Sequence, residues 1–251
     1  MKVTRALFRL TFMEIRLFLR EKETVFWTFL FPVLIIWLFG SMFGDQTIDG
    51  QNFGETYIPA WIGVNLLTTA LFGVGTILTQ YRKQGVLRRL RATPIRPVTV
   101  LTAHLLQGAL TFLIGALILV GFGMAVYNLR LPQYPGSFMI AVGLAVFALY
   151  PFAIFATSFA KDNRTSAAIS SVLLNVMLFL SGATFPLEMM PEFIRQVSKI
   201  LPLYYVVDLF QETWNRSPLW ENTGSAGVLV GIAVVFTCLA SHFFRWTSRE
   251  P

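Results

Sequence analysis

The chain has 251 residues, of which 55% are hydrophobic and only 13% are charged. A soluble domain is usually about one-quarter charged, so this composition excludes an ordinary soluble globular protein. The single cysteine, Cys238, excludes an intrachain disulfide.

Residues 2–23 are predicted to form an amphipathic helix at the membrane surface. At about 100° per residue, five of its six basic side chains fall in one stripe. Glu14 and Glu21 lie together on a different side, and leucine, isoleucine and phenylalanine residues supply apolar surface. The stripe includes Arg5, Arg9, Arg16 and Arg20. Two interpretations stay open: a basic anchor that fixes the N-terminus at the membrane, or a docking surface for a partner.

Six stretches contain no Asp, Glu, Lys or Arg, at 24–44, 56–81, 97–129, 131–160, 165–187 and 222–244. A helix needs about 20 mainly apolar residues to cross a bilayer, and every stretch is long enough. We therefore predict an all-α polytopic membrane protein. Its six transmembrane helices are expected at 25–43, 57–79, 94–127, 138–159, 167–181 and 224–244.

The distribution of basic residues predicts the orientation. Of the 20 Lys and Arg residues, 16 fall on the side that holds the N-terminus and only four on the other side. By the positive-inside rule, both termini are cytoplasmic. Topology thus accounts for the net charge of +7 without a nucleic-acid partner.

Residues 82–92, between the second and third spans, are predicted to form a short amphipathic helix. Val86, Leu87 and Leu90 share one face, and Thr93-Pro94 ends the helix, since the residue before a proline avoids the α conformation. Arginines that meet anionic lipid would explain the charge of this segment. They would not explain its ordered glycine, apolar face and Thr-Pro stop.

Residues 184–213 differ from the spans because charged residues are spread through apolar sequence. Pro191 and Pro202 divide this segment into two short amphipathic pieces. These pieces are expected to lie on the outer face of the membrane or to dip into it.

The motifs of membrane enzymes are missing from the sequence. No Gly-Lys pair occurs, so there is no phosphate-binding loop, and neither H-E-x-x-H nor G-x-S-x-G is present. The middle of each span also lacks an ionisable residue, which weighs against a proton-coupled carrier. We predict a non-enzymatic chain that binds no metal or cofactor itself.

Mildly polar residues within the second and fifth spans have two interpretations. They could form hydrogen bonds between helices, or, with nearby phenylalanines, line a translocation pathway. The candidate pathway residues are Asn65, Thr68, Thr69, Phe72, Ser171, Asn175 and Phe179.

Two motifs carry a family resemblance. The segment RKQGVLRRLRATP at 82–94 resembles the R-E-x-G-x-L-x-R-L-x-A-T-P segment of ABC-2 type transporter permeases. The segment SGATFPLEMMPEFIRQVSKILPLYYVVD at 181–208 is similar to that family's [SG]-G-x-x-[FY]-P-x-x-x-[ML]-P…P-x-x-Y-x-x-[DE] region. The chain departs from the first motif at Lys83, where the family usually has an acid.

The resemblance implies roles for both motifs. In the family, the first segment is a coupling helix that docks on an ATPase subunit; here it comprises Arg82, Lys83, Gln84, Gly85, Val86, Leu87, Arg88, Arg89, Leu90 and Arg91. The second segment forms short extracellular re-entrant helices, with Phe185, Pro186, Glu188, Pro191, Pro202, Tyr205 and Asp208 at its motif positions.

The resemblance also implies a function and partners. The chain would be the permease subunit of an exporter in a bacterial or archaeal cell membrane, paired with a second permease and with two ATP-binding subunits that hold ATP and Mg. The substrate would be a drug-, antibiotic- or lipid-like amphiphile. Family alternatives are a polysaccharide or lipid-linked glycan, haem, or an ion. Two alternative functions do not depend on the resemblance to a family of exporters: a secondary carrier that needs no ATPase, and a sensory membrane subunit.

Overall fold

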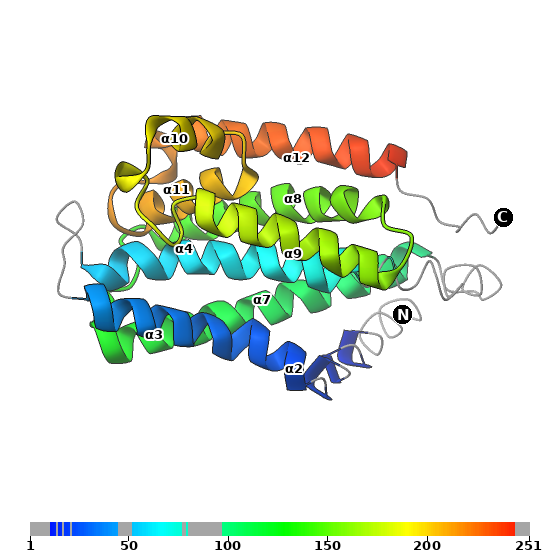
Figure 1. Cartoon of the computed structure of the whole chain (residues 1–251), viewed down its shortest axis with the longest axis horizontal. Coiled ribbons are helices and arrows are strands. Elements are labelled where there is room, and N and C mark those ends of the chain that lie inside the picture. Colours follow the sequence, from blue (N-terminus) through cyan, green and yellow to red (C-terminus); the bar gives the residue numbers. More distant parts are fainter. Residues whose placement is uncertain are drawn as a thin grey trace.

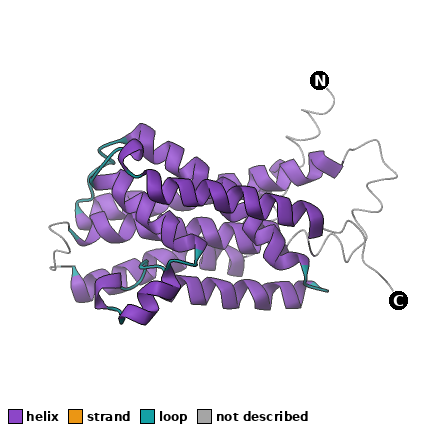
Figure 2. Cartoon of the chain, turned by 90° about the horizontal axis from the view of Figure 1, so that it is seen from above, coloured by secondary structure: helices purple, strands orange, loops and turns teal. Residues whose placement is uncertain are grey.

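The computed structural model describes residues 11–13, 15–16, 18–20, 22–44, 52–76, 79 and 97–243. Within them the chain contains helices and short connections, and no strand (Figures 1 and 2). Six helices are long and apolar enough to cross a membrane, at Phe26–Phe43, Phe53–Gly75, Thr102–Tyr127, Pro135–Ser158, Asn163–Leu180 and Thr223–Phe243. The predicted all-α membrane protein with six spans is confirmed.

The first two spans each combine an α-helix with a π-helical segment. After α2 (Lys22–Val25), the π-helix η1 (Phe26–Leu30) leads into α3 (Phe31–Phe43). In the second span, α4 (Phe53–Thr68) continues into the π-helix η2 (Thr69–Gly75). The remaining spans are α7 (Pro97–Tyr127), α8 (Pro135–Ser158), α9 (Asn163–Leu180) and α12 (Thr223–Phe243).

Local sequence signals set several helix ends. Glu55, in the first turn of α4, accepts a hydrogen bond from the backbone amide of Asn52 at 3.3 Å, as in a capping box. Asp162 caps α9 by accepting from the amide of Thr165 at 2.8 Å. Prolines open α8 and the later helix α11, where a missing N–H costs nothing.

The second span lies at the centre of the bundle. Most of its residues between Phe53 and Gly75 are buried, and it contacts α3, α7, α8, α9 and α11. Its glycine at 63 allows close packing, because a Cβ there would lie 3.1 Å from Val206 of α11. The other spans leave broad apolar surfaces exposed, as expected of helices that face lipid or another protein.

The segment after α9 folds onto one end of the bundle. It contains η3 (Leu187–Met189), α10 (Glu192–Ser198), α11 (Pro202–Asn215) and η4 (Leu219–Glu221), and Figure 1 places α10 and α11 at the same end. Of these, α11 packs into the bundle, against α4, α8 and α12. The two predicted pieces after Pro191 and Pro202 therefore form short helices, the second of which is inserted among the spans.

Three side chains of α11 fix this position. Gln211 and Asn215 donate to the carbonyls of Thr56 and Glu55, in the first turn of α4, at 3.0 and 2.7 Å. The indole nitrogen of Trp214 donates to the Arg130 carbonyl at 3.0 Å, and its ring lies 4.8 Å from that of Phe138. These bonds satisfy backbone carbonyls near the end of the bundle and tie α11 to α4 and to the connection that precedes α8.

Some predicted features lie outside the described residues. These are the whole coupling segment 82–92, the helix start at Thr93-Pro94, and Arg5 and Arg9 of the N-terminal segment. The described residues from 11 to 20 are helical, with Arg16 and Arg20 exposed.

Candidate translocation site

The four candidate residues on the second span divide into two pairs. Asn65 is only 1% exposed, and Thr69 is also buried. Thr68 and Phe72, one turn apart, are half-buried at the edge of the helix. The Thr69 hydroxyl donates to the carbonyls of Asn65 and Leu66 at 3.0 and 2.9 Å. The buried pair faces neighbouring helices, so an open pathway along this span could use only the edge pair.

The three candidates on α9 form one exposed row, named here the α9 stripe: Ser171, Asn175 and Phe179. They are spaced four residues apart, so they follow one another along one helix face. All three are exposed, and Phe179 is 50% exposed. The side-chain amide nitrogen of Asn175 donates to the Ser171 carbonyl at 2.8 Å. Among the described residues, its amide oxygen has no donor.

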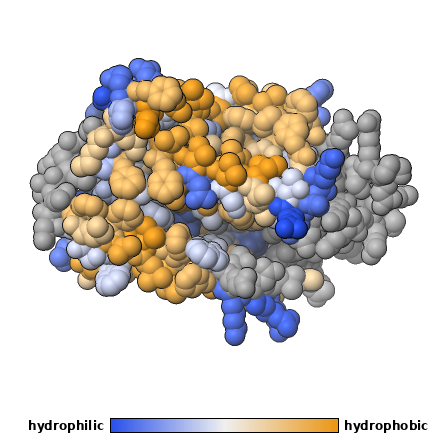
Figure 3. Space-filling view, viewed as in Figure 1, coloured by the Kyte–Doolittle hydropathy of each residue, from blue (hydrophilic) through white to orange (hydrophobic). Residues whose placement is uncertain are grey.

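The α9 stripe belongs to the least apolar of the six spans, of which only 17% is buried. Figure 3 shows small hydrophilic areas that interrupt the hydrophobic surface on the side from which α9 is seen in Figure 1. Polar groups that face hydrocarbon without a partner are costly. This surface is therefore suited to contact with protein or with a polar pathway rather than with lipid chains.

An aromatic cluster lies where the α9 stripe ends. The ring of Phe185 is 6.4 Å from that of Phe179 and 5.9 Å from that of Phe39 on α3, which in turn stacks on Phe43 at 6.2 Å. Gly182, with a φ of +85°, makes the turn that leads from α9 to Phe185, a conformation that favours glycine. A cavity of about 40 Å³ borders Phe39, Phe43, Tyr57, Thr184, Phe185, Pro186 and Met189.

The remaining motif residues of the 181–208 segment are spread over its short helices. Pro191 and Pro202 stand at the starts of α10 and α11, and Glu188 lies in η3. The Tyr205 hydroxyl donates to the Lys199 carbonyl at 2.8 Å, which joins α11 to the turn that precedes it. These residues shape the end of the bundle, and Phe185 is the one that contacts the stripe.

Asp208 of α11 is partly buried and accepts a hydrogen bond from the Ser225 hydroxyl of α12 at 2.5 Å. Burial raises the pKa of its carboxyl. The bond from Ser225 opposes this rise, the Glu212 carboxylate adds to it, and the Arg216 guanidinium opposes it. Ser225 could not be identified from the sequence, because nothing in its surroundings distinguishes it from other serines in the spans.

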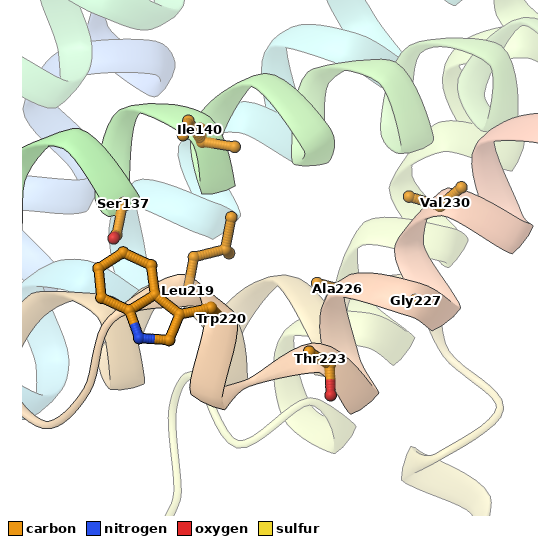
Figure 4. A pocket seen from close by; sticks show the side chains of 8 residues that line it. All are labelled: Ser137, Ile140, Leu219, Trp220, Thr223, Ala226, Gly227 and Val230. Atoms are coloured by element: carbon orange, nitrogen blue, oxygen red, sulfur yellow. The ribbon is translucent and has the colours of Figure 1, made fainter.

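A larger groove lies on another side of the bundle, between α8 and the start of α12 (Figure 4). Its volume is about 310 Å³, and it is lined by Ser137, Ile140, Leu219, Trp220, Thr223, Ala226, Gly227 and Val230. No charged side chain lines it, so it offers only apolar surface and a few hydroxyl and indole groups. In the described part of the chain, no three His, Cys, Asp or Glu residues come together as metal ligands.

Comparison with known proteins agrees with this architecture. A model of the family described as "ABC-2 family transporter protein" matches residues 49–242. The chain is 22% identical to the putative transport permease YvfS of Bacillus subtilis over 92% of its own length and 94% of that protein's. It is 26% identical to Nodulation protein J of Rhizobium meliloti, over 84% of the chain and 82% of that protein.

The inner membrane transport permease YhhJ of Escherichia coli is 25% identical, over 78% of this chain and 55% of that protein. The family match covers all but the first of the six spans. From its six apolar helices and this match, the chain belongs to the ABC-2 family of transport permeases, as a multi-pass membrane protein.

Proposed function

We propose that this chain is the membrane subunit of an ATP-driven exporter of an amphipathic drug-, antibiotic- or lipid-like substrate. In the proposal, a separate ATP-binding subunit docks on residues 82–92, and two permease chains form the pathway between them. The observation that carries the proposal is the exposed α9 stripe, which places Asn175 on the outside of a membrane span.

The α9 stripe supports pairing of two permease chains. A free amide oxygen in the hydrocarbon region lacks a donor, whereas a second copy or a water-lined path between copies supplies one. A two-fold symmetric pair presents the same surface from both chains. The stripes of two copies would then line one pathway, and the aromatic clusters would lie at one end of it.

The chemistry of the stripe favours an amphipathic substrate. Between Thr165 and Leu180, α9 carries hydroxyl, amide and aromatic side chains but no ionisable group. Such a wall can pack against an apolar body and form a few hydrogen bonds, but it offers no charge to select a strongly ionic substrate. A polysaccharide, haem or ion exporter would need selective groups from elsewhere in the complex.

The distribution of basic residues supports a cytoplasmic location for both termini and for 82–92. The end of the bundle that carries α10 and α11 would then face outward. This orientation would place the apolar face of Leu87 and Leu90 on the side where ATP is available.

Purification of the chain with a co-expressed ATP-binding subunit tests the proposal. In lipid discs, Leu87→Asp or Leu90→Asp should leave the permease inserted but abolish its effect on ATP hydrolysis. The matched control is Leu131→Asp, at an exposed leucine in the connection between α7 and α8, which should couple normally. Unchanged coupling in the Leu87 and Leu90 variants would contradict docking at this segment.

Two other outcomes would identify the alternatives. Transport by the purified chain alone, driven by an ion gradient, would establish a secondary carrier. Ligand-dependent ATP hydrolysis without movement of the ligand into vesicles would establish a sensory subunit.

Cysteine cross-linking tests the pairing surface separately. The exposed Cys238 is the only cysteine, so Cys238→Ser gives a cysteine-free background. Asn175→Cys should then form a disulfide-linked dimer in membranes. Val234→Cys, at an exposed position on α12, should stay monomeric; equal cross-linking at both positions would count against the α9 surface.

A further inference from the structure

The two π-helical segments lie in spans that touch each other: η1 opens the first span, and η2 closes the second. A π-helical turn holds an extra residue, and such turns inside α-helices are frequently found at functional sites. If such a turn converts to a regular α-turn, the helix beyond it shifts by one residue. That shift corresponds to about 100° of rotation and about 1.5 Å of travel. Each segment can therefore change which face its helix presents.

Within η2, the Leu71 carbonyl accepts hydrogen bonds from side chains as well as from the backbone. The Leu71 carbonyl accepts from the backbone amide of Thr76 in the π pattern and also from the Thr76 hydroxyl at 3.2 Å. The buried Ser170 hydroxyl of α9 donates to the same oxygen at 3.4 Å. The π conformation of η2 is thus held in part by the helix that carries the α9 stripe.

Asn65 connects the two π-helical segments. Its side-chain nitrogen donates to the carbonyl of Thr28, in the middle of η1, at 3.1 Å. Its own backbone carbonyl accepts from the hydroxyl of Thr69, the first residue of η2. One buried residue therefore contacts both segments, and its side chain bridges two spans.

The Asn65 side chain is also confined by a third helix. A Cβ on Gly115 of α7 would lie 2.7 Å from its oxygen and 2.8 Å from its nitrogen. That oxygen is buried and has no hydrogen-bond partner in the described part of the chain. An unpaired buried acceptor costs about 1–3 kcal/mol, so stability alone favours an apolar side chain at this position.

We infer that Asn65 is a positioning residue that makes η1 and η2 change their helical turns together during transport. A movement of η2 is then passed by Asn65 to Thr28 and so to the first span. In the opposite direction, a movement of η1 is passed by Asn65 to η2, after which the chain continues toward residues 82–92. The unpaired oxygen belongs to one state of the cycle and gains a donor in the other. This inference rests on the proposed function, because it assigns the movement to the ATP-driven cycle.

Hydrogen exchange tests the inference in the permease–ATPase complex in lipid discs. Backbone exchange of peptides covering 26–30 and 69–75 is compared without nucleotide and after trapping with ATP and vanadate. In the wild type, exchange should change in both segments. In Asn65→Leu, the change should persist in 69–75 and be lost in 26–30, because Thr28 no longer has its link to the second span.

Gly115→Ala provides a second variant that leaves Asn65 in place. The new methyl must displace the Asn65 amide, so the response of 26–30 should again be lost. Gly121→Ala is the matched control on the same helix, because a Cβ there meets nothing within 4 Å, and it should behave as the wild type. If either Asn65→Leu or Gly115→Ala fails to assemble with the ATPase, the comparison uses the other of these two variants.

Each result bears on a different claim. A wild-type complex that hydrolyses ATP but shows no exchange change in either segment would overturn the inference and leave the proposed function standing. A nucleotide-dependent change in the exchange of 26–30 that survives in Asn65→Leu or in Gly115→Ala would also overturn the inference and leave the proposed function standing. Failure of the wild-type chain to form a complex that hydrolyses ATP would overturn the proposed function, and the inference with it.

Discussion

Replacement of Trp214 should separate the docking of α11 from the rest of the fold. Trp214 is 2% exposed, and its indole nitrogen bonds to the Arg130 carbonyl. Truncation of a buried aromatic residue costs about 3–5 kcal/mol, so Trp214→Ala should destabilise the protein by that amount. At about 2–4 °C per kcal/mol for a chain near this size, the melting temperature should fall by roughly 6–20 °C.

Trp214→Phe isolates the hydrogen bond. The phenyl ring keeps much of the contact with Phe138 but leaves the Arg130 carbonyl without its donor. This carbonyl is only partly enclosed, so the cost should lie near the lower end of the range for an unpaired group, at about 1 kcal/mol. The melting temperature should then fall by about 2–4 °C.

The assay is thermal unfolding of the purified chain in detergent, followed by loss of the monodisperse peak. Trp220→Ala is the control, because Trp220 is 71% exposed and a surface substitution typically changes stability by under about 0.5 kcal/mol. Equal melting temperatures for Trp214→Ala and Trp220→Ala would refute the placement of α11 within the bundle.

Three further predictions concern other contacts. Because the pKa of Asp208 is raised in the folded protein, its ionisation lowers stability as pH rises from the ordinary value of 3.8 through the raised one. Asp208→Asn should therefore melt higher than the wild type above that window and equally below it; a constant difference would contradict this. Asp162→Ala removes the cap of α9 and should cost about 1 kcal/mol, measured by thermal unfolding against Asn163→Ala. Gly63→Val should cost about 1–3 kcal/mol by overpacking against Val206, whereas Gly143→Val, where a Cβ meets nothing within 4 Å, should not.

The six spans could be predicted because membrane insertion imposes a length and excludes charge, and both are visible in one sequence. Which side of each span packs against the bundle could not be predicted from the sequence. Asn65 and Asn175 are the same residue type, each surrounded by apolar sequence, yet one is buried and the other exposed. When every face of a helix is apolar, periodicity carries no signal for which face meets protein.

The π-helical segments and the insertion of α11 among the spans could not be predicted from the sequence either. The residues of η2, TALFGVG, are compatible with an ordinary α-helix. The Leu71 carbonyl of the π-helical segment accepts from the Ser170 hydroxyl, 99 positions later, a contact that local sequence does not reveal. Amphipathicity predicted that the piece after Pro202 would lie on the membrane or dip into it. Its burial depends on space left by Gly63 and on carbonyls of α4, which only the packed bundle provides.

The bonds from Gln211 and Asn215 to the first turn of α4 have a consequence for biosynthesis. The partners are 155 and 160 positions apart, and ribosomes add about 5–20 residues per second. The central helix therefore waits about 8–30 s in the bilayer before the segment that completes its packing is made. Throughout this interval the first turn of α4 lacks its final partners, so a chain that stops before residue 202 inserts but stays incomplete. Such a chain lacks α11, so the carbonyls of Thr56 and Glu55 and the face of α4 that α11 covers stay without their partners.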